Sequence, residues 1–158
     1  MILGIDPGKN GALCFYRGGL DVKFYKMPEI FHIADLTRAF QEEGKPNRVY
    51  IEKAQSMPSQ GVKSMFEYGK HTGWLLGVLQ SLNIPTVEVP PQTWCKEIHK
   101  GVTQHKGAGS GKKKSLEASA KLFPGVDFRA SDRSVKLHDG YIDAALIAKY
   151  AWDKYGGK

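Results

Sequence analysis

The sequence predicts an α/β domain with a mixed five-stranded β-sheet, an antiparallel meander followed by parallel strands, flanked by α-helices. Two observations support this class. Short apolar runs separated by glycine turns open the chain, and strand and helix patterns alternate from residue 28 onward. At 158 residues the chain is the size of one domain, so we expect a single compact unit over residues 1–158.

The first three strands are expected over residues 1–6, 12–17 and 22–27. The glycine-containing turns at 7–11 and 17–19 are short, which implies antiparallel neighbours. Helical spacing of apolar residues then begins near residue 30 and ends near Gly44, and a further strand is expected over 48–52.

A long amphipathic helix is predicted over residues 61–82. Its apolar positions include Phe66 and Trp74, which a helix of this kind normally turns toward the core. Gly69, Gly73 and Gly77 cost helix propensity, so we expect another element to pack against them.

The remaining elements follow from proline and glycine positions. A strand over 85–89 ends at the double proline, and a short helix follows over 92–99. Residues 101–111 contain four glycines and no apolar periodicity, so an exposed, mobile loop is expected there, leading into three lysines. Helices are then predicted from Ser115 to the proline at 124 and over about 137–154, with a loop at 126–135 between them.

Charge narrows the possible partners. The chain carries 23 Lys and Arg against 16 Asp and Glu, a net charge of +7 and a pI near 9.4. Such a balance favours nucleic acid or another anionic surface, although many basic proteins bind neither. The two cysteines, Cys14 and Cys95, form no CxxC pair, which fits a reducing cytoplasm and packing roles. With no charged leader and no apolar run of 18 residues, we expect no membrane association.

Four acidic residues occupy positions that bear on chemistry. Asp6 and Glu52 each end a short apolar strand, and Asp139 and Asp143 stand one helical turn apart. Each has an ordinary alternative: a turn cap for Asp6, a salt bridge for Glu52, and a favourable helix N-terminus for the pair. Taken together, the four favour a site for a hard divalent cation, because packed carboxylates otherwise repel one another.

Two oxygen-bound divalent ions could activate water against a phosphodiester, and this carboxylate inventory suits them. Mg²⁺ is the expected ion, and Mn²⁺ accepts the same ligands. The run Lys112-Lys113-Lys114 follows the glycine loop. Lys113 or Lys114 could stabilise charge on the phosphate, and any of the three could instead contact only the DNA backbone.

The motifs Gly4-Ile5-Asp6-Pro7-Gly8, Tyr50-Ile51-Glu52, Lys112-Lys113-Lys114-Ser115 and the 139–145 segment together resemble the RuvC-type Holliday junction resolvases, especially short phage-type members. The resemblance implies an RNase H-like fold, a homodimer and Mg²⁺-dependent nicking of opposed strands of a four-way DNA junction, in the cytoplasm of a bacterial or phage-infected cell.

By position, the resemblance makes Asp6, Glu52 and Asp143 metal-binding carboxylates and Asp139 the fourth, with His138 as a competing ligand or simply a helix-start residue. It associates the helix after Glu52 with dimer contacts. The expected DNA-binding residues are Lys9, Gln55, Ser56, Met57, Gln60, Lys106, Lys112, Lys113 and Lys114. Trp94 is expected to pack in the core rather than contact bases.

Other functions remain open at this point. An ATP-handling protein of the actin and sugar-kinase type also begins with a strand, an Asp and glycines, but it needs two domains and more residues than 158. A binding protein without catalysis would not need four carboxylates near DNA phosphates. Other RNase H-like nucleases, acting on flaps, branched DNA or RNA–DNA hybrids, are the alternatives among enzymes.

Overall fold

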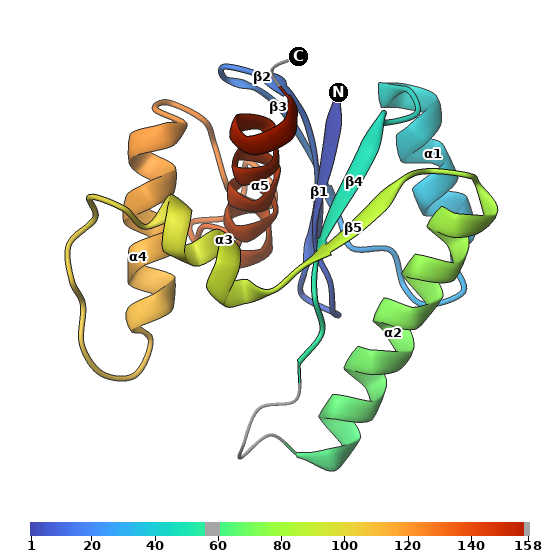
Figure 1. The fold of residues 1–158 in the computed structure, drawn as a ribbon, viewed down its shortest axis with the longest axis horizontal. Coiled ribbons are helices and arrows are strands. Elements are labelled where there is room, and N and C mark those ends of the chain that lie inside the picture. Colours follow the sequence, from blue (N-terminus) through green and yellow to red (C-terminus); the bar gives the residue numbers. More distant parts are fainter. Residues whose placement is uncertain (56–60, 157–158) are drawn as a thin grey trace.

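The computed structural model describes residues 1–55 and 61–156 and is centred on one five-stranded sheet (Figure 1). The strands run in the spatial order β3-β2-β1-β4-β5. Their bounds are β1 Ile2–Asp6, β2 Ala12–Gly18, β3 Asp21–Lys26, β4 Arg48–Glu52 and β5 Thr86–Val89. The first three strands form an antiparallel meander, whereas β4 pairs parallel with both β1 and β5. The predicted mixed sheet is therefore confirmed.

Helices cover both faces of this sheet, so the molecule has three layers (Figure 1). They are α1 Ile33–Glu43, α2 Val62–Ser81, α3 Pro91–Ile98, α4 Ser110–Leu122 and α5 Asp139–Ala151, the last continued by a π-helical turn over Trp152–Gly156. One apolar core lies between the sheet and α1 and α2, and a second lies between the sheet and α3, α4 and α5. Among the described residues, no helix is long and apolar enough to cross a membrane.

The lysine run lies in a helix rather than after a loop, which corrects one prediction. Helix α4 begins at Ser110, so Lys112, Lys113 and Lys114 all belong to its first turns. The left-handed Gly109 precedes the helix, and its carbonyl accepts from the Lys113 amide. Apolar periodicity could not reveal this start because the first turns carry no apolar side chain. They face solvent, and the buried residues begin at Ser115.

Helix α2 departs from its predicted packing. Phe66 is 67 % exposed instead of buried, because the N-terminal half of α2 extends past the end of the sheet (Figure 1). Trp74, farther along, does pack against the core. Within the described chain no atom lies within 4 Å of a Cβ built on Gly69, Gly73 or Gly77, so the partner expected for these glycines is not another part of the described fold.

Candidate metal centre

Asp6 and Glu52 leave the sheet side by side because β1 and β4 are parallel. Their register pairs Ile5 with Ile51, so the next residue of each strand is one of the two acids, at the same edge. Side chains alternate between the faces of a strand. Leu3, Ile5 and Ile51 belong to the core under α1 and α2, so the two acids point to the opposite face, which α5 covers.

Two glycines bring α5 close to this edge. A Cβ built on Gly4 would lie 2.3 Å from the carbonyl oxygen of Ala144, so α5 rests directly on the backbone of β1. At the start of α5, a Cβ on Gly140 would lie 2.6 Å from the carbonyl oxygen of Asn10 in the β1–β2 turn. Only hydrogen at these positions allows such close approach. The first turn of α5 is thereby held against the strand end that carries Asp6.

Asp139 and Asp143 lie on this first part of α5, one turn apart as predicted. Burial raises the pKa of Asp6 well above its ordinary value, and the charges of Asp143, Glu52 and Asp139 raise it further. Burial likewise raises the pKa of Asp143 to about 6, with a smaller contribution from Asp139. For Glu52, burial and then the charge of Asp143 raise the pKa, against a hydrogen bond from Trp94. The structure thus brings all four predicted acids into one electrostatic cluster.

The cluster has the donor chemistry of a hard-cation site. Oδ1 of Asp143 is buried and has no hydrogen-bond partner in the part of the chain that the structure describes, which is costly for a carboxylate oxygen unless a cation or water reaches it. In this arrangement, no three acidic, histidine or cysteine side chains within residues 1–55 and 61–156 are placed to hold one ion together. The donor types and the orphaned oxygen fit divalent metal, and binding would require the carboxylates to draw closer.

His138 acts as a helix cap. Its Nδ1 accepts a hydrogen bond from the Tyr141 amide at 3.3 Å, and its ring stacks on the Tyr141 ring at 4.4 Å. An acceptor nitrogen already used in this way is not free to coordinate metal from the same lone pair. This bond leaves Nε2 of His138 uncommitted, so the choice between His138 and Asp139 as the fourth ligand stays a prediction; Asp139 is the one whose charge acts on Asp6.

No protein-family model matches the chain, and no curated protein matches it by sequence. Solved structures do match. Thermus thermophilus RuvC in complex with a Holliday junction substrate superposes with a TM-score of 0.61 at 15 % identity, covering 98 % of this chain and 96 % of that one. The match covers nearly the whole of both chains. The fold is that of the RuvC-type resolvases.

Two further matches come from other sources. The yeast mitochondrial Holliday junction resolvase Ydc2 has a TM-score of 0.58 at 14 % identity, covering 98 % of this chain and 81 % of that one. Fowlpox virus resolvase, solved with substrate Holliday junction DNA, has a TM-score of 0.58 at 16 % identity, covering 98 % of this chain and 99 % of that one. At such identities the likeness establishes the RuvC-type, RNase H-like fold and leaves activity to be argued from the site.

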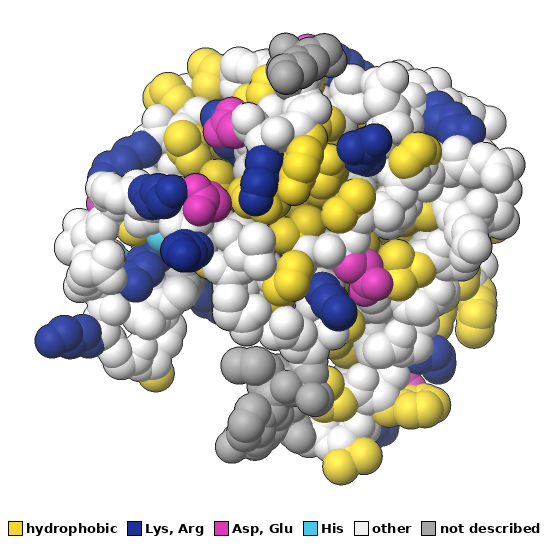
Figure 2. All heavy atoms as spheres, in the orientation of Figure 1, with side chains coloured by type: hydrophobic (Ala, Val, Ile, Leu, Met, Phe, Trp, Pro, Cys, Tyr) yellow, Lys and Arg dark blue, Asp and Glu magenta, His cyan; other side chains and the backbone are white. Residues whose placement is uncertain are grey.

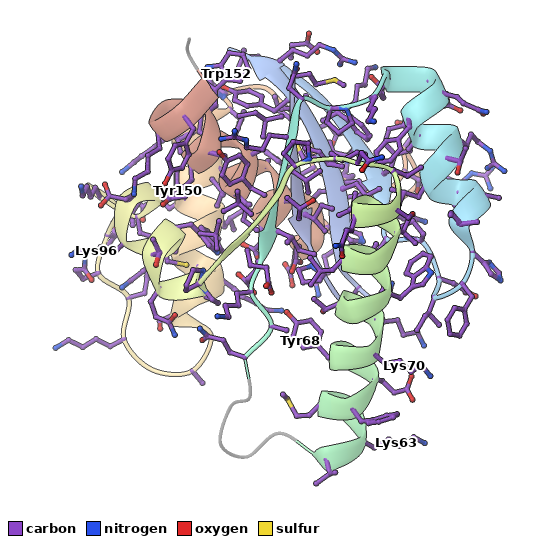
Figure 3. All side chains as sticks on the ribbon, turned by 45° about the vertical axis from the view of Figure 1, so that its right-hand side comes forward. Lys63, Tyr68, Lys70, Lys96, Tyr150 and Trp152 are labelled. Carbon is purple, nitrogen blue, oxygen red and sulfur yellow. The ribbon has the colours of Figure 1, made fainter. Side chains whose placement is uncertain are left out.

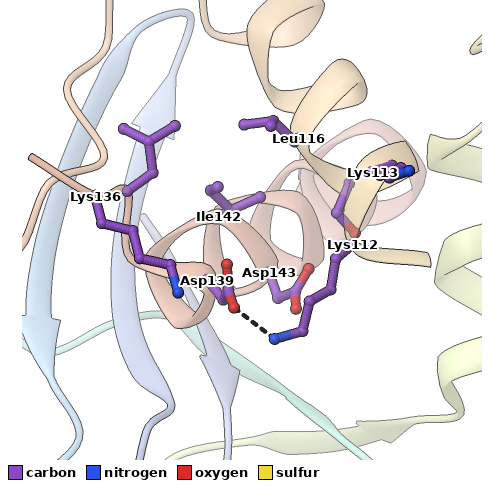
Figure 4. A pocket seen from close by; sticks show the side chains of 9 residues that line it. Lys112, Lys113, Leu116, Lys136, Asp139, Ile142 and Asp143 are labelled. Atoms are coloured by element: carbon purple, nitrogen blue, oxygen red, sulfur yellow. Dashed lines mark hydrogen bonds and ion pairs between the residues drawn. The ribbon is translucent and has the colours of Figure 1, made fainter. Parts of the chain in front are cut away.

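Within this RuvC-type fold, the three consecutive lysines have different surroundings. Lys112 Nζ donates to Asp139 Oδ2 at 2.6 Å across the gap between α4 and α5 (Figure 4). Lys113 lines the cavity between α4 and α5, which has a volume of about 280 Å³. Lys114 turns to the loop before α4 and donates to Gln104 at 3.0 Å. The catalytic role expected for Lys113 or Lys114 stays a prediction, and Lys112 is the lysine that contacts the acidic cluster.

The other expected DNA contacts are spread over this edge of the RuvC-type fold. Lys9, in the β1–β2 turn, and Lys106, in the loop before α4, are exposed, and Gln55 exchanges hydrogen bonds with Gln92. Ser56, Met57 and Gln60 lie outside the described residues. Dark-blue Lys and Arg side chains gather over the part of the surface where Figure 1 places α3 and α4 (Figure 2).

Two side chains at the site were not assigned to it from sequence. Trp94 on α3 donates a hydrogen bond to Glu52, and Tyr68 on α2 packs so that a Cβ on Gly8 would lie 3.2 Å from its ring. Burial and the charges of Glu52 and Asp6 raise the pKa of Tyr68. In Figure 3, Tyr68 points from α2 toward the sheet end, while Lys63 and Lys70 point away. Neither residue belongs to a local motif, so no sequence signal singled them out.

Proposed function

We propose that this protein is a Mg²⁺-dependent, structure-selective DNA endonuclease that resolves four-way junctions by nicking opposed strands as a homodimer. The observation that carries the proposal is the meeting of Asp6, Glu52, Asp139 and Asp143 at one edge of a RuvC-type fold. Buried acids that raise one another's pKa are typical of functional sites, and a binding-only protein gains nothing from them.

The same four carboxylates would hold two Mg²⁺ ions, and Mn²⁺ could substitute. When bound, such ions activate water for attack on a phosphodiester and stabilise the departing oxygen. The protein's own contribution is to carry the carboxylates on three elements, β1, β4 and α5, that meet at one edge of the sheet, so that modest side-chain movements can complete the ligand set.

Positive charge beside the acids would position the polyanion. Lys112, Lys113 and Lys114 share the first turns of α4, and Lys112 and Lys113 line the cavity that faces the start of α5 (Figure 4). Lys9 and Lys106 would extend contacts to the backbone on either side, together with Gln55 and the segment that follows it. Phosphate contacts of this kind set register without reading sequence, so recognition would rest on junction shape.

The homodimer is proposed from α2. Its exposed face carries Val62, Phe66, Gly69, Gly73 and Gly77, here called the α2 glycine face; Val62 is 87 % exposed. This face lies opposite the buried residues of the helix, such as Leu75. A symmetric contact between two copies would cover the apolar side chains and place two sites across a two-fold axis, as paired incisions of a near-symmetric junction require.

Strand-labelled four-way junctions, duplex, flaps and RNA–DNA hybrids, incubated with Mg²⁺ or chelator, test the proposal. Paired nicks in opposed junction strands are expected with wild type and Mg²⁺. Asp6→Asn and Glu52→Gln should abolish them while junction binding persists. Preferential cutting of flaps or hybrids would reassign the substrate to another RNase H-like nuclease class, and binding without any metal-dependent cutting would overturn the nuclease proposal.

A further inference from the structure

We propose that Trp94 is a positioning residue for Glu52, fixing which oxygen of that carboxylate is presented to metal. The inference rests on the proposed metal site and concerns a residue that sequence analysis assigned to the core alone. Trp94 Nε1 donates to Glu52 Oε2 at 2.9 Å, joining residues 42 positions apart in the chain.

The hydrogen bond from Trp94 to Glu52 lies inside the protein rather than on its surface. Trp94 is only 3 % exposed, so its indole N–H has no access to bulk water and must find a partner inside the protein. The partner it has is an ionisable oxygen at the strand end. Trp152 is only partly buried, and its ring packs edge-on against Tyr16 at the opposite end of α5 from Asp139 and Asp143. It therefore serves as an indole control that lies away from the acids.

Helix α3 is anchored to hold the indole in place. It begins at Pro91 directly after β5, and Gln92 exchanges two amide hydrogen bonds, at 3.0 and 3.4 Å, with Gln55 on the segment that follows Glu52. At the other end, the ring of His99 contacts Trp94 edge-on, and its Nε2 lies 3.3 Å from the Ser115 hydroxyl on α4. The indole is thus braced from both sides.

The hydrogen bond sets the orientation of the Glu52 carboxylate. A carboxylate on a flexible Glu side chain can rotate and present either oxygen, whereas the indole bond holds Oε2 in one orientation and leaves both lone pairs of Oε1 for a cation. Hydrogen bonds from the protein to ligating groups orient those groups, and their loss typically lowers metal affinity about 10- to 100-fold. Trp94 would act through Glu52, without touching metal or DNA.

The test uses the full-length protein and Mn²⁺ or Mg²⁺ alone as the probe. Calorimetric titration with Mn²⁺ should show about tenfold weaker binding by Trp94→Phe, which keeps an aromatic ring but removes the N–H. Trp152→Phe, the matched control, should bind as wild type does. In parallel, the three tryptophans give three indole N–H signals in a ¹⁵N correlation spectrum. Adding Mg²⁺ to wild type should shift the Trp94 signal and leave that of Trp152 in place.

The outcomes separate this inference from the proposed function. If wild type binds Mn²⁺ but Trp94→Phe binds equally tightly, or if both variants weaken binding alike, the positioning role is overturned and the metal site stands. If wild type binds no Mn²⁺ and no indole signal moves, the metal site itself is overturned. Should Trp94→Phe fail to fold, the Mg²⁺ titration of wild type decides, and an unmoved Trp94 signal with metal bound refutes the inference.

Discussion

Lys112 Nζ lies 2.6 Å from Oδ2 of Asp139, so an ammonium group partly neutralises the acidic cluster (Figure 4). Both side chains are accessible, at 73 % and 47 % exposure, so the pair contributes little to stability. The pair matters because of where it lies. A cation that binds Asp139 must compete with Lys112, and a DNA phosphate could draw the lysine away.

Replacing Lys112 should therefore have opposite effects on metal binding and on cleavage. For Lys112→Gln we expect Mn²⁺ to bind about 1.4- to fivefold more tightly without DNA, since an exposed ion pair is worth about 0.2–1 kcal/mol. Junction cleavage should slow by at least tenfold, because a positive charge beside the phosphate is lost. Calorimetry and single-turnover cleavage measure the two effects. Lys149→Gln, near the far end of α5, is the control; weaker Mn²⁺ binding by Lys112→Gln would contradict the competition.

Asp143 should make the metal-free protein less stable at higher pH. Its pKa is raised from 3.8 to about 6 by burial, so between these values the folded chain holds more protons than the unfolded chain. The free energy of unfolding must then fall as pH rises through this window. Asp143→Asn should stabilise the metal-free protein by about 1–3 kcal/mol at pH 8 and by almost nothing at pH 4. Urea unfolding at the two pH values, with chelator, measures the gain; an equal effect at both would refute the assignment.

Mg²⁺ should offset the loss of stability that the buried, ionised carboxylates cause at high pH. A ligand present at about 100 times its Kd adds about 2.7 kcal/mol to the stability of the folded state. We expect saturating Mg²⁺ to raise the Tm of wild type by several degrees at pH 8 and far less at pH 5, where the cluster is partly protonated. Differential scanning calorimetry gives the shift. Asp6→Asn should show little shift at either pH, and a full shift in that variant would remove Asp6 from the ligand set.

Gly4 should be intolerant of any side chain. A methyl group there meets the Ala144 carbonyl at 2.3 Å and must push α5 away from β1. We expect Gly4→Ala to lower the free energy of unfolding by about 1–3 kcal/mol and to weaken Mn²⁺ binding, because Asp143 moves with the helix. The matched control is Gly111→Ala, in the exposed first turn of α4 with open space around it, which should be neutral or stabilise by up to about 1 kcal/mol. A neutral Gly4→Ala would show that the contact relaxes without cost.

The α2 glycine face should control oligomeric state. Gly73→Arg places a long charged side chain at its centre, in open space within the protomer, and should convert dimers to monomers without loss of fold. Sedimentation velocity measures the mass, and plasmid-borne junctions report whether the two nicks remain coupled. Gln41→Arg, on the exposed side of α1, adds the same charge elsewhere. Dimers that persist in Gly73→Arg would move the interface to another surface.

Much of this fold was predictable because its signals are local. Glycine turns of a few residues require the β1–β2–β3 meander, and the double proline at 90–91 separates β5 from α3. Asp6 and Glu52 each end an apolar run, so strand direction alone carries them to one sheet edge. The i, i+4 spacing of Asp139 and Asp143 likewise places both on one helix face.

Other features depended on contacts between distant segments. Phe66 belongs to an apolar helical pattern, yet it is exposed because α2 extends past the end of the sheet. Helix α4 starts five residues early because its first turns need no apolar face. Asp139 pairs with Lys112 rather than with the neighbouring lysines, and Glu52 pairs with Trp94. Both outcomes depend on side-chain direction between residues that are 27 and 42 positions apart in the chain.

The sequence by itself determined the order of strands and helices and the acidic inventory at their ends, since periodicity and turn chemistry act over a few residues. Only the tertiary structure decided how closely those acids meet, through the bare backbones of Gly4 and Gly140, and which lysine and which indole reach them. Those outcomes depend on packing distances between layers, which no local pattern encodes.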